Sequence, residues 1–300
     1  MSMRVLVAGS SGLIGSALLP VLRHAGHEVL RLVRRPASAR DERSWDPPAG
    51  RIQDGTLDGV DAVLNLCGAG IGDKRWSQAR KQTLLDSRVE PTEVLAAAVA
   101  EHKIPVLVNA SAVGFYGDTG DRTVDESGPK GQGFLADLVH EWESATRPAA
   151  DAGARVALLR TGLVFAESGG LLGKLKPLVS LMLGGKLGDG RQYWPWISLD
   201  DELAAIRFVL EHEDISGPVN LCAPEQLTNA ELTKVMGEVM GRPTPWTVPG
   251  FALRAVLGEF ADEGVLIGQR ATPKALLDHG FQFQHETLAT ALPEVLGQRA

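Results

Sequence analysis

A glycine-rich turn near the N-terminus, GSSGLIG, constrains the fold of this chain more than any other segment. Gly9, Gly12 and Gly15 directly follow the apolar run 4–8 and open a segment of helical period, 13–24. Glycines at a strand-to-helix turn allow close backbone approach, and the first N–H groups of the helix are free to hold an anion. The turn therefore predicts a βαβ unit that binds the pyrophosphate of a dinucleotide. The alternative is a tight turn without a ligand.

We expect the backbone at Ser11, Leu13 and Ile14 to line the dinucleotide together with these glycines. About 20 residues beyond such a turn, an NAD-binding protein carries an Asp or Glu that holds the ribose hydroxyls. This chain has Arg34 and Arg35 there instead. Guanidinium groups suit the 2′-phosphate of NADP, so the sequence predicts NADP(H) over NAD, with Arg34 making most of the contact. A solvated loop is the alternative reading of the two arginines.

Short β-branched runs alternate with longer segments of helical period through the first half of the chain, as in βαβ units around a parallel sheet. We expect strands at residues 4–8, 28–33, 61–67, 104–110, 155–160 and 218–222. We expect helices at residues 13–24, 87–102, 133–152 and 199–213. Pro91 would then lie in a first turn, where proline is tolerated. The pattern predicts the α/β class with a doubly wound parallel (Rossmann) sheet.

The alternation breaks after Leu163, where Gly-, Lys- and Trp-bearing stretches begin. We therefore predict an NADP-binding Rossmann domain formed by residues 1–163 plus 197–223. Residues 164–196 plus 224–300 would form a smaller α+β lobe that binds the substrate. The two ligands would meet in the cleft between these parts. Residues 171–188 predict a helix with loops that covers this cleft.

Composition and charge exclude several classes of protein. Apolar residues make up 44% of the 300 residues and charged residues 22%, which is typical of a globular protein. The net charge of −7 and the lack of a Lys/Arg block argue against nucleic acid or a membrane surface as the main partner. The uncharged run 5–22 is interrupted by glycines, serines and Pro20, so it predicts neither a membrane span nor a signal peptide.

Cysteine and histidine usage narrows the chemistry further. Cys67 and Cys222 are too few for a disulfide framework, so we expect a reducing, cytoplasmic location. The seven histidines show neither H-x-x-x-H nor H-E-x-x-H spacing, so no metal is predicted. The chain also lacks the G-x-S-x-G of serine hydrolases, and it carries no signal for an oligomeric state.

Further segments match a known group of proteins. They are SWDP at 44–47, DAVLNLCGAGIGDKRW at 61–76, SRVEPTEVL at 87–95, SAVGFYG at 111–117, FLADLVHEWE at 134–143 and LRTGLV at 159–164. With the glycine turn, and in this order, they resemble the extended, epimerase/dehydratase-like short-chain dehydrogenase/reductases. Within these, the chain is similar to an atypical subgroup known as epimerase family proteins. Residues 272–284, TPKALLDHGFQFQ, resemble the C-terminal module of that subgroup.

This resemblance implies roles for residues at the carboxyl edge of the sheet. Leu66, Cys67 and Gly68 would line the adenosine side of the cofactor, and Arg88 would lie near its phosphate or ribose end. Leu163 would approach the nicotinamide with its backbone. A plainer reading makes Leu66 and Leu163 ordinary core side chains and Arg88 a surface cation.

The usual catalytic pair of the superfamily is missing. Active members use a Tyr with a Lys four residues later on one helix, aided by Ser or Thr. The corresponding positions here are Leu135 and Val139, and no Y-x-x-x-K occurs in the chain. One interpretation makes Tyr116 the acid/base, assisted by Ser111. In the other, Tyr116 packs under the cofactor and Ser111 is a strand-end cap.

The sequence therefore leaves two functions open. The first is an NADP(H)-binding oxidoreductase or epimerase homologue that acts on a small polar substrate, sugar- or nucleotide-like by family analogy alone. The second is a catalytically weak or inactive NADP-dependent binding or sensor protein. The aromatic stretch 192–201, QYWPWISLDD, would either stack on a planar ligand or form hinge packing.

Overall fold

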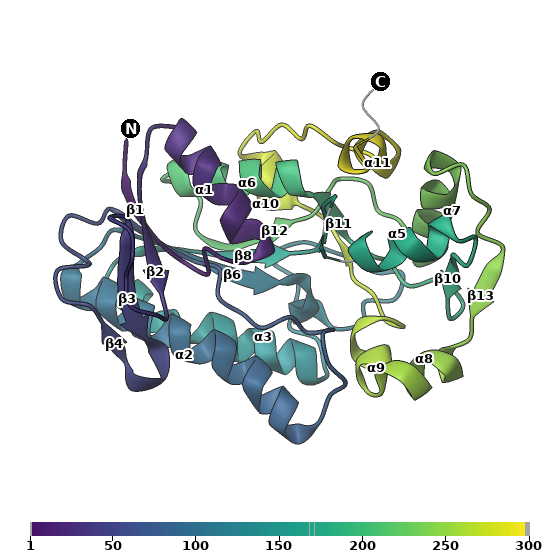
Figure 1. Ribbon diagram of the computed structural model, residues 1–300, viewed down its shortest axis with the longest axis horizontal. Coiled ribbons are helices and arrows are strands. Elements are labelled where there is room, and N and C mark those ends of the chain that lie inside the picture. The colour runs from purple at the N-terminus through teal and green to yellow at the C-terminus, as the bar shows by residue number, and fades with distance from the viewer. Residues whose placement is uncertain (1, 168, 171, 298–300) are drawn as a thin grey trace.

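A largely parallel β-sheet forms the centre of the molecule, whose computed structural model describes residues 2–167, 169–170 and 172–297 (Figure 1). Its strand order is β12-β8-β6-β5-β1-β2-β3-β4. The strands are β1 (Arg4–Ala8), β2 (Glu28–Val33), β3 (Glu42–Asp46), β4 (Arg51–Ile52), β5 (Ala62–Asn65), β6 (Val106–Ala112), β8 (Arg155–Thr161) and β12 (Gly217–Leu221). Each neighbouring pair is parallel except β3 and β4. The order reverses at β1, which pairs with β2 on one side and with β5 on the other.

Helices cover both faces of this sheet (Figure 1). One face carries α1 (Leu13–His24) and α6 (Leu199–Glu211). The other carries α2 (Gln78–His102), α3 (Phe134–Ser144) and α4 (Arg147–Asp151). Side chains alternate along each strand, so Val5 and Val7 of β1 pack toward α1 while Leu6 packs toward α2. The predicted doubly wound α/β fold is therefore confirmed.

Two helix predictions need correction. α2 begins at Gln78, where the Ser77 hydroxyl accepts a hydrogen bond from the Arg80 N–H at 3.2 Å. Pro91 therefore lies well inside the helix, and the expectation of a first-turn position is wrong. The helix expected at 133–152 is two helices, α3 and α4, because Pro148 has no N–H to continue the helical ladder.

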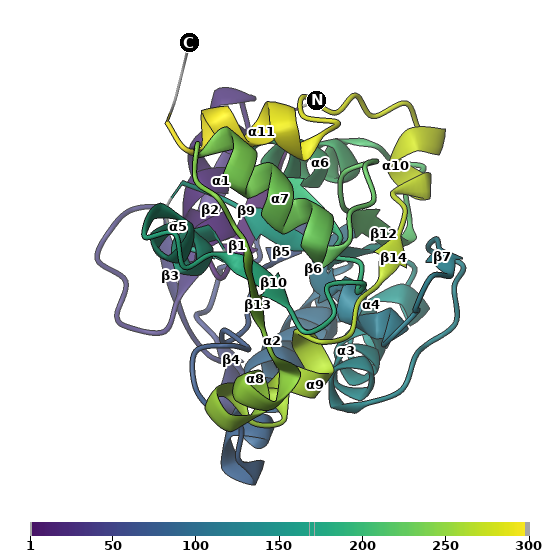
Figure 2. The ribbon, with the colours of Figure 1, turned by 90° about the vertical axis from the view of Figure 1, so that its right-hand side faces the viewer.

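The remaining elements lie beyond the carboxyl edge of the sheet or along its flank (Figure 2). Short strand pairs are β9 (Leu163–Phe165) with β11 (Trp196–Ser198), β10 (Gly185–Leu187) with β13 (Trp246–Val248), and β7 (Thr123–Val124) with β14 (Arg270–Ala271). Helices are α5 (Leu172–Ser180), α7 (Asn229–Val239), α8 (Gly250–Leu257), α9 (Phe260–Gly264), α10 (Lys274–Asp278) and α11 (Leu288–Val295). Two 3₁₀ turns are η1 (Pro47–Ala49) and η2 (Val113–Tyr116). The expected helix with loops at 171–188 corresponds to α5 followed by β10, apart from residue 171, which lies outside the described residues.

The C-terminal segment is fastened to the sheet layer at the start of α6. Asp201 accepts hydrogen bonds from the backbone N–H groups of Gln284 and His285, at 2.7 and 3.0 Å. The His285 ring lies between Ser198, 3.0 Å from Nδ1, and Glu294, 3.2 Å from Nε2. Because such contacts join the parts 1–163 plus 197–223 and 164–196 plus 224–300, the division into two domains stays a prediction. In the part of the chain that the structure describes, helices are too short or too polar to cross a bilayer.

Candidate functional site

The glycine turn forms a close-packed cradle between β1 and α1. Gly9 has a φ of +80°, and a Cβ there would lie 2.5 Å from the Leu66 carbonyl oxygen. A Cβ at Gly15 would lie 2.3 Å from the Gly9 carbonyl oxygen. Neither position can carry a side chain without moving the backbone of β1 or of the β5 end. The turn therefore brings the β1, β5 and α1 backbones together where the strand order reverses.

The N-terminus of α1 is open to an anion. Its N-cap residue, Gly12, gives no side-chain hydrogen bond, and the Gly12 N–H donates to the Gly9 carbonyl at 3.1 Å. Ser11 is exposed, and Leu13 and Ile14 are partly exposed at the first helical turn. The first N–H groups of a helix have no partner within it and carry the positive end of its dipole. The structure thus brings together the predicted residues of the turn in a form that suits a pyrophosphate.

The two arginines after β2 have different surroundings. Arg35 donates to both carboxylate oxygens of Glu42, at 2.6 and 2.8 Å, and to the Ser38 hydroxyl. Arg34 is exposed and forms neither a hydrogen bond nor an ion pair with any residue that the structure describes. Burial raises the pKa of the Cys67 thiol to about 12, and the nearby charge of Arg34 acts in the opposite direction. The charge of Arg34, directly after β2, is therefore not used within the described fold, whereas Arg35 is paired with Glu42 of β3.

The end of β5 carries a second cation. A Cβ at Gly68 would lie 3.2 Å from the Arg88 guanidinium carbon, so Arg88 of α2 lies directly against this loop. Its Nη2 donates to the Ala69 carbonyl at 2.9 Å and its Nη1 to the Leu84 carbonyl at 3.0 Å. The plainer reading of Arg88 as a surface cation is wrong, because the residue is only 9% exposed.

Arg88 is a buried charge held by carbonyl dipoles. It forms no ion pair with a carboxylate among residues 2–167, 169–170 and 172–297. Burial lowers its pKa to about 10, and the neighbouring charge of Arg80 adds to this effect, so Arg88 remains protonated at neutral pH. A buried charge without a counter-ion costs free energy unless a ligand compensates it. The site thus has two cations, Arg34 and Arg88, on the two sides of the glycine cradle.

Leu163 lies at the same carboxyl edge, at the start of β9. Its backbone N–H donates to the Pro195 carbonyl at 2.7 Å, and Gly162 donates to the Leu221 carbonyl at 2.9 Å. The backbone amide of Leu163 is therefore used within the fold. The predicted backbone approach of Leu163 to a nicotinamide stays a prediction for its remaining atoms.

The predicted catalytic residues, Ser111 and Tyr116, lie in one buried polar network. The Ser111 hydroxyl donates to Glu143 Oε1 at 2.6 Å. Arg160 holds both oxygens of Glu143, at 2.8 and 2.9 Å, and donates to the Tyr116 hydroxyl at 3.0 Å. That hydroxyl in turn donates to Asn220 Oδ1 at 2.8 Å. The network joins β6, α3, β8, η2 and β12.

This environment weighs against proton transfer by Tyr116. Its side chain is 1% exposed, and its hydroxyl is already engaged as both donor and acceptor. Burial raises the pKa of Tyr116 to about 12, although Arg160 partly offsets the effect. The geometry favours the other interpretation, in which the phenol is a packing and hydrogen-bonding residue.

The turn of α3 that the sequence predicts to correspond to the Tyr–Lys pair of the superfamily has apolar side chains. A Cβ at Gly114 would lie 3.8 Å from Leu135 Cβ and 4.0 Å from Val139 Cγ2. Leu135 and Val139 of α3 therefore both face the end of β6. The residues that sequence reasoning missed are Glu143 and Arg160, and the FLADLVHEWE and LRTGLV segments that contain them were the only available signal.

No cluster of three or more potential metal ligands occurs within the described ranges of the chain.

The aromatic residues of the stretch 192–201 pack within the fold. Trp194 and Trp196 are buried, and the Arg270 guanidinium carbon lies over the Tyr193 ring, 4.7 Å from its centroid.

A parallel sheet with helices on both faces, a glycine cradle at the point of strand reversal and cations on both sides of it define a dinucleotide-binding Rossmann protein. Residues 5–222 match the model of the NAD dependent epimerase/dehydratase family, and residues 248–295 match a domain of unknown function, DUF1731. The chain belongs to this epimerase/dehydratase family. The resemblance to epimerase family proteins is thereby confirmed.

Several known proteins are similar over nearly the whole of this chain. An epimerase family protein of Mycobacterium tuberculosis, MT2273, is 55% identical over 288 residues, 96% of each chain. The crystal structure of the human epimerase family protein SDR39U1 with NADPH has a TM-score of 0.91 and 33% identity, covering 99% of this chain and 100% of that one. A nucleoside-diphosphate sugar epimerase from Corynebacterium glutamicum has a TM-score of 0.83 and 36% identity, covering 100% of this chain and 59% of that one.

Proposed function

We propose that the protein is an NADP(H)-dependent oxidoreductase that acts on a small molecule. The observation that carries the proposal is the pair of cations without carboxylate partners, Arg34 and Arg88, that flank the glycine cradle. The structure of human SDR39U1, which contains NADPH, supports the same cofactor here.

Each part of the chain has a distinct task in this proposal. The first amides of α1 bind the pyrophosphate, and the closeness of Gly9 and Gly15 to neighbouring backbone keeps side chains out of that position. Arg34 binds the 2′-phosphate, which distinguishes NADPH from NADH. Arg88 compensates the negative charge that passes the end of β5. The cofactor supplies a hydride, and the protein supplies orientation and electrostatics.

Epimerase chemistry is less well supported by the site. Oxidation of a sugar hydroxyl needs a base beside the reacting oxygen, and the positions that hold such a base in active relatives are Leu135 and Val139 here. The similar Corynebacterium glutamicum structure is that of a nucleoside-diphosphate sugar epimerase, and that activity is the alternative reaction class for this chain.

The cofactor-dependent binding protein remains the second candidate function. It is favoured by the surroundings of Tyr116, whose hydroxyl donates to Asn220 and accepts from Arg160 inside the fold. Calorimetric titration with NADPH and NADH tests both candidates, because both require tight NADPH binding. We expect NADPH to bind at least about tenfold more tightly than NADH. Hydride consumption then separates them: NADPH binding with no oxidation on any acceptor supports the binding protein.

The contribution of the second cation to cofactor binding is tested with Arg88→Met. The control is Arg51→Met, which changes the net charge by the same amount at a side chain on β4 that is 74% exposed. NADPH affinity falls in the first variant and stays unchanged in the second. Equal affinity in both variants contradicts the role of Arg88.

We place the protein in the cytoplasm, since Cys67 and Cys222 are both free thiols. Its partners are a nicotinamide cofactor and a small-molecule substrate. The net charge of −7 and the dispersed Lys and Arg residues argue against nucleic acid and membranes as main partners.

A further inference from the structure

Apolar side chains border the carboxyl ends of β5 and β6. Ile71 and Trp76 follow β5, Ala112 ends β6, and Phe115 lies in the turn η2 that comes next. Leu135 of α3 lies against this turn, since a Cβ at Gly114 would be 3.8 Å from its Cβ. All five are partly exposed, and the first four pack around the buried Leu84, Leu138 and Val139. We call the five residues Ile71, Trp76, Ala112, Phe115 and Leu135 the apolar wall.

The apolar wall lies on the side of the sheet where the reactive end of a dinucleotide is expected. A dinucleotide crosses the point of strand reversal, so its two halves lie over opposite sides of β1. Arg34, at the end of β2, marks the adenosine half. The nicotinamide half must then lie over β5, β6 and β8, beside the wall.

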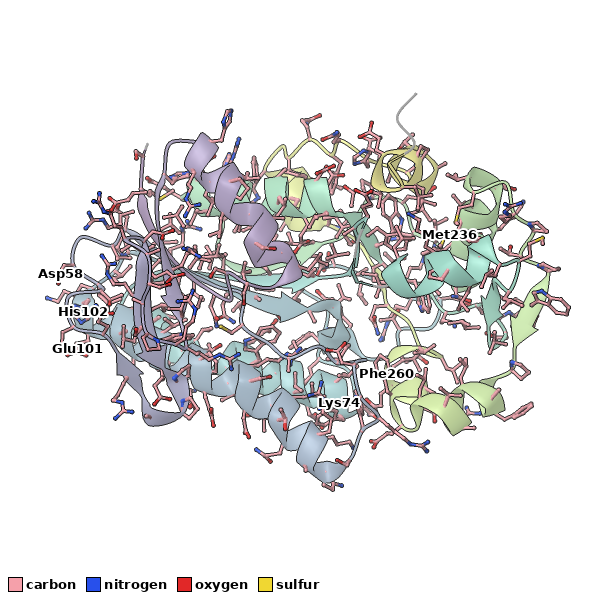
Figure 3. All side chains as sticks on the ribbon, in the orientation of Figure 1. Asp58, Lys74, Glu101, His102, Met236 and Phe260 are labelled. Carbon is pink, nitrogen blue, oxygen red and sulfur yellow. The ribbon has the colours of Figure 1, made fainter. Side chains whose placement is uncertain are left out.

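The C-terminal module, which is the segment 248–295 that matches DUF1731, closes one end of this wall. Phe260 of α9 and Phe134 of α3 both pack on Trp76, with ring centroids 5.3 and 5.1 Å apart from it. Figure 3 labels Phe260 of α9 and, on the loop before α2, Lys74, both in the lower half of the view. Arg75 donates to the Ala255 carbonyl of α8 at 2.8 Å. The module therefore adds further aromatic surface beside the wall.

The polar groups around the wall are engaged in the fold. Ser111 and Tyr116 are held in the Glu143–Arg160 network described above. The Arg160 guanidinium carbon lies 3.6 Å from the Phe115 ring centroid, so this cation covers one face of that ring. Lys81 lies over the Phe134 ring at 4.9 Å and is ion-paired with Glu259. A substrate held here meets hydrocarbon and aromatic surface, with no free acid or base presented by these side chains.

We propose that the substrate is a planar, conjugated and largely apolar carbonyl compound of the quinone or enone class. This inference rests on the proposed function and replaces the polar substrate expected from the sequence. Such an acceptor stacks on aromatic side chains, and it spreads the charge that hydride addition creates over its own conjugated system. It does not require an acid on the protein at the reacting atom.

The reaction balances without a further reagent. A quinone gains a hydride, which is two electrons and one proton, from the reduced nicotinamide. A second proton comes from water, and the products are the hydroquinone and the oxidised nicotinamide. The apolar wall orients the acceptor and excludes water from the ring face.

The experiment uses the full chain with NADP⁺ bound and 2-methyl-1,4-naphthoquinone as the probe. Binding is read as quenching of intrinsic tryptophan fluorescence, since Trp76 belongs to the wall, and turnover is read as NADPH oxidation. We expect saturable quenching and turnover with the quinone, and neither with UDP-glucose. Turnover with UDP-glucose and none with the quinone overturns the proposal. NADPH binding without any quinone binding also overturns it, yet leaves the proposed function intact, whereas loss of NADPH binding defeats both.

Two variants locate the quinone on the wall. Leu135→Ser makes the partly exposed face of α3 polar, and we expect a loss of quinone affinity of about tenfold with unchanged NADPH affinity. Phe115→Leu keeps the wall apolar but removes the ring, so it keeps the fold and weakens quinone stacking. Val256→Ser, at a side chain 73% exposed on α8, is the matched control and leaves quinone affinity unchanged. Equal quinone affinity in all three variants contradicts the assignment.

Discussion

Arg35 donates from Nη1 and Nη2 to the two carboxylate oxygens of Glu42, at 2.8 and 2.6 Å, in a forked ion pair. Glu42 begins β3, and its side chain is only 3% exposed. The Arg35 guanidinium holds the pKa of this carboxyl well below its usual range. The pair ties the loop after β2 to the neighbouring strand and uses the charge of Arg35 within the fold. Arg34 is then the arginine available to a 2′-phosphate.

Arg34→Glu should reduce the preference for NADPH over NADH by about 10- to 100-fold, because it removes charge-assisted hydrogen bonds and adds repulsion. Calorimetric titration of both cofactors measures the ratio. Arg35→Ala is the matched control: it removes the forked pair from Glu42, which keeps only Arg31 at 3.3 Å and the hydrogen bonds from Ser38, so the melting temperature falls while the cofactor ratio holds. An unchanged ratio in Arg34→Glu removes Arg34 from the site.

Gly12→Ala and Gly15→Ala separate the two tasks of the glycine turn. A Cβ at Gly15 meets the Gly9 carbonyl oxygen at 2.3 Å, so the backbone must shift, and overpacking of this kind costs about 1–3 kcal/mol. A Cβ at Gly12 lies 3.5 Å from the same oxygen, an ordinary contact. Thermal unfolding should therefore show a clear loss for Gly15→Ala and a small change for Gly12→Ala.

The cofactor titration of these glycine variants completes the test. Gly12→Ala should weaken NADPH binding despite its near-normal melting temperature, because the methyl group stands at the mouth of the anion site. Full NADPH affinity in Gly12→Ala contradicts the placement of the pyrophosphate at the α1 N-terminus.

The sequence predicted the elements whose signals are local. β1 and β2 have the expected bounds, since their apolar runs are flanked by turn residues. β3, ERSWD, was missed because it is a polar strand that is recognisable only from its pairing with β2. The first turns of α2 were missed because QARKQTLLD has little apolar periodicity, and Ser77 alone marks their start.

The candidate site divides in the same way. The glycine turn could be predicted from the sequence because strand, turn and helix are contiguous in the chain. Arg35 is ion-paired and Arg34 is not, because Glu42 of the neighbouring strand reaches only Arg35. The hydrogen bond of Ser111 depends on Glu143, which is held by Arg160, and both residues lie far along the chain from Ser111. Contacts of this kind follow from tertiary packing, and a single sequence contains no local pattern that encodes them.

Tyr116→Phe should lower stability by about 1–3 kcal/mol, because it leaves the buried Asn220 Oδ1 without its phenolic donor and Arg160 without one acceptor. Any NADPH-oxidising activity should keep its pH profile, since the phenol takes no part in proton transfer. Urea unfolding and a pH–rate series measure the two effects. A lost or shifted alkaline limb in the variant would restore Tyr116 as the acid/base.

Glu202 gives the fold a built-in dependence on pH. Its side chain is fully buried at the start of α6, with Oε1 accepting from the Thr161 hydroxyl at 2.9 Å and Oε2 without a partner among the described residues. Burial raises the pKa of Glu202 to about 8. Between its ordinary value of 4.5 and 8, the folded chain keeps a proton that the unfolded chain has lost.

Stability should therefore fall as pH rises through this window, by up to about 1.4 kcal/mol per pH unit from this group. Below pH 4.5 the contribution of Glu202 is fully present, and above 8 it is lost. Glu202→Gln keeps the shape of the neutral acid and removes the titration. Urea unfolding at pH 5.5, 6.5 and 7.5 should give a flatter profile for Glu202→Gln than for the wild type, after subtraction of a matched series for the exposed control Glu238→Gln. Parallel profiles for Glu202→Gln and the wild type would show that the buried carboxyl is ionised in the fold.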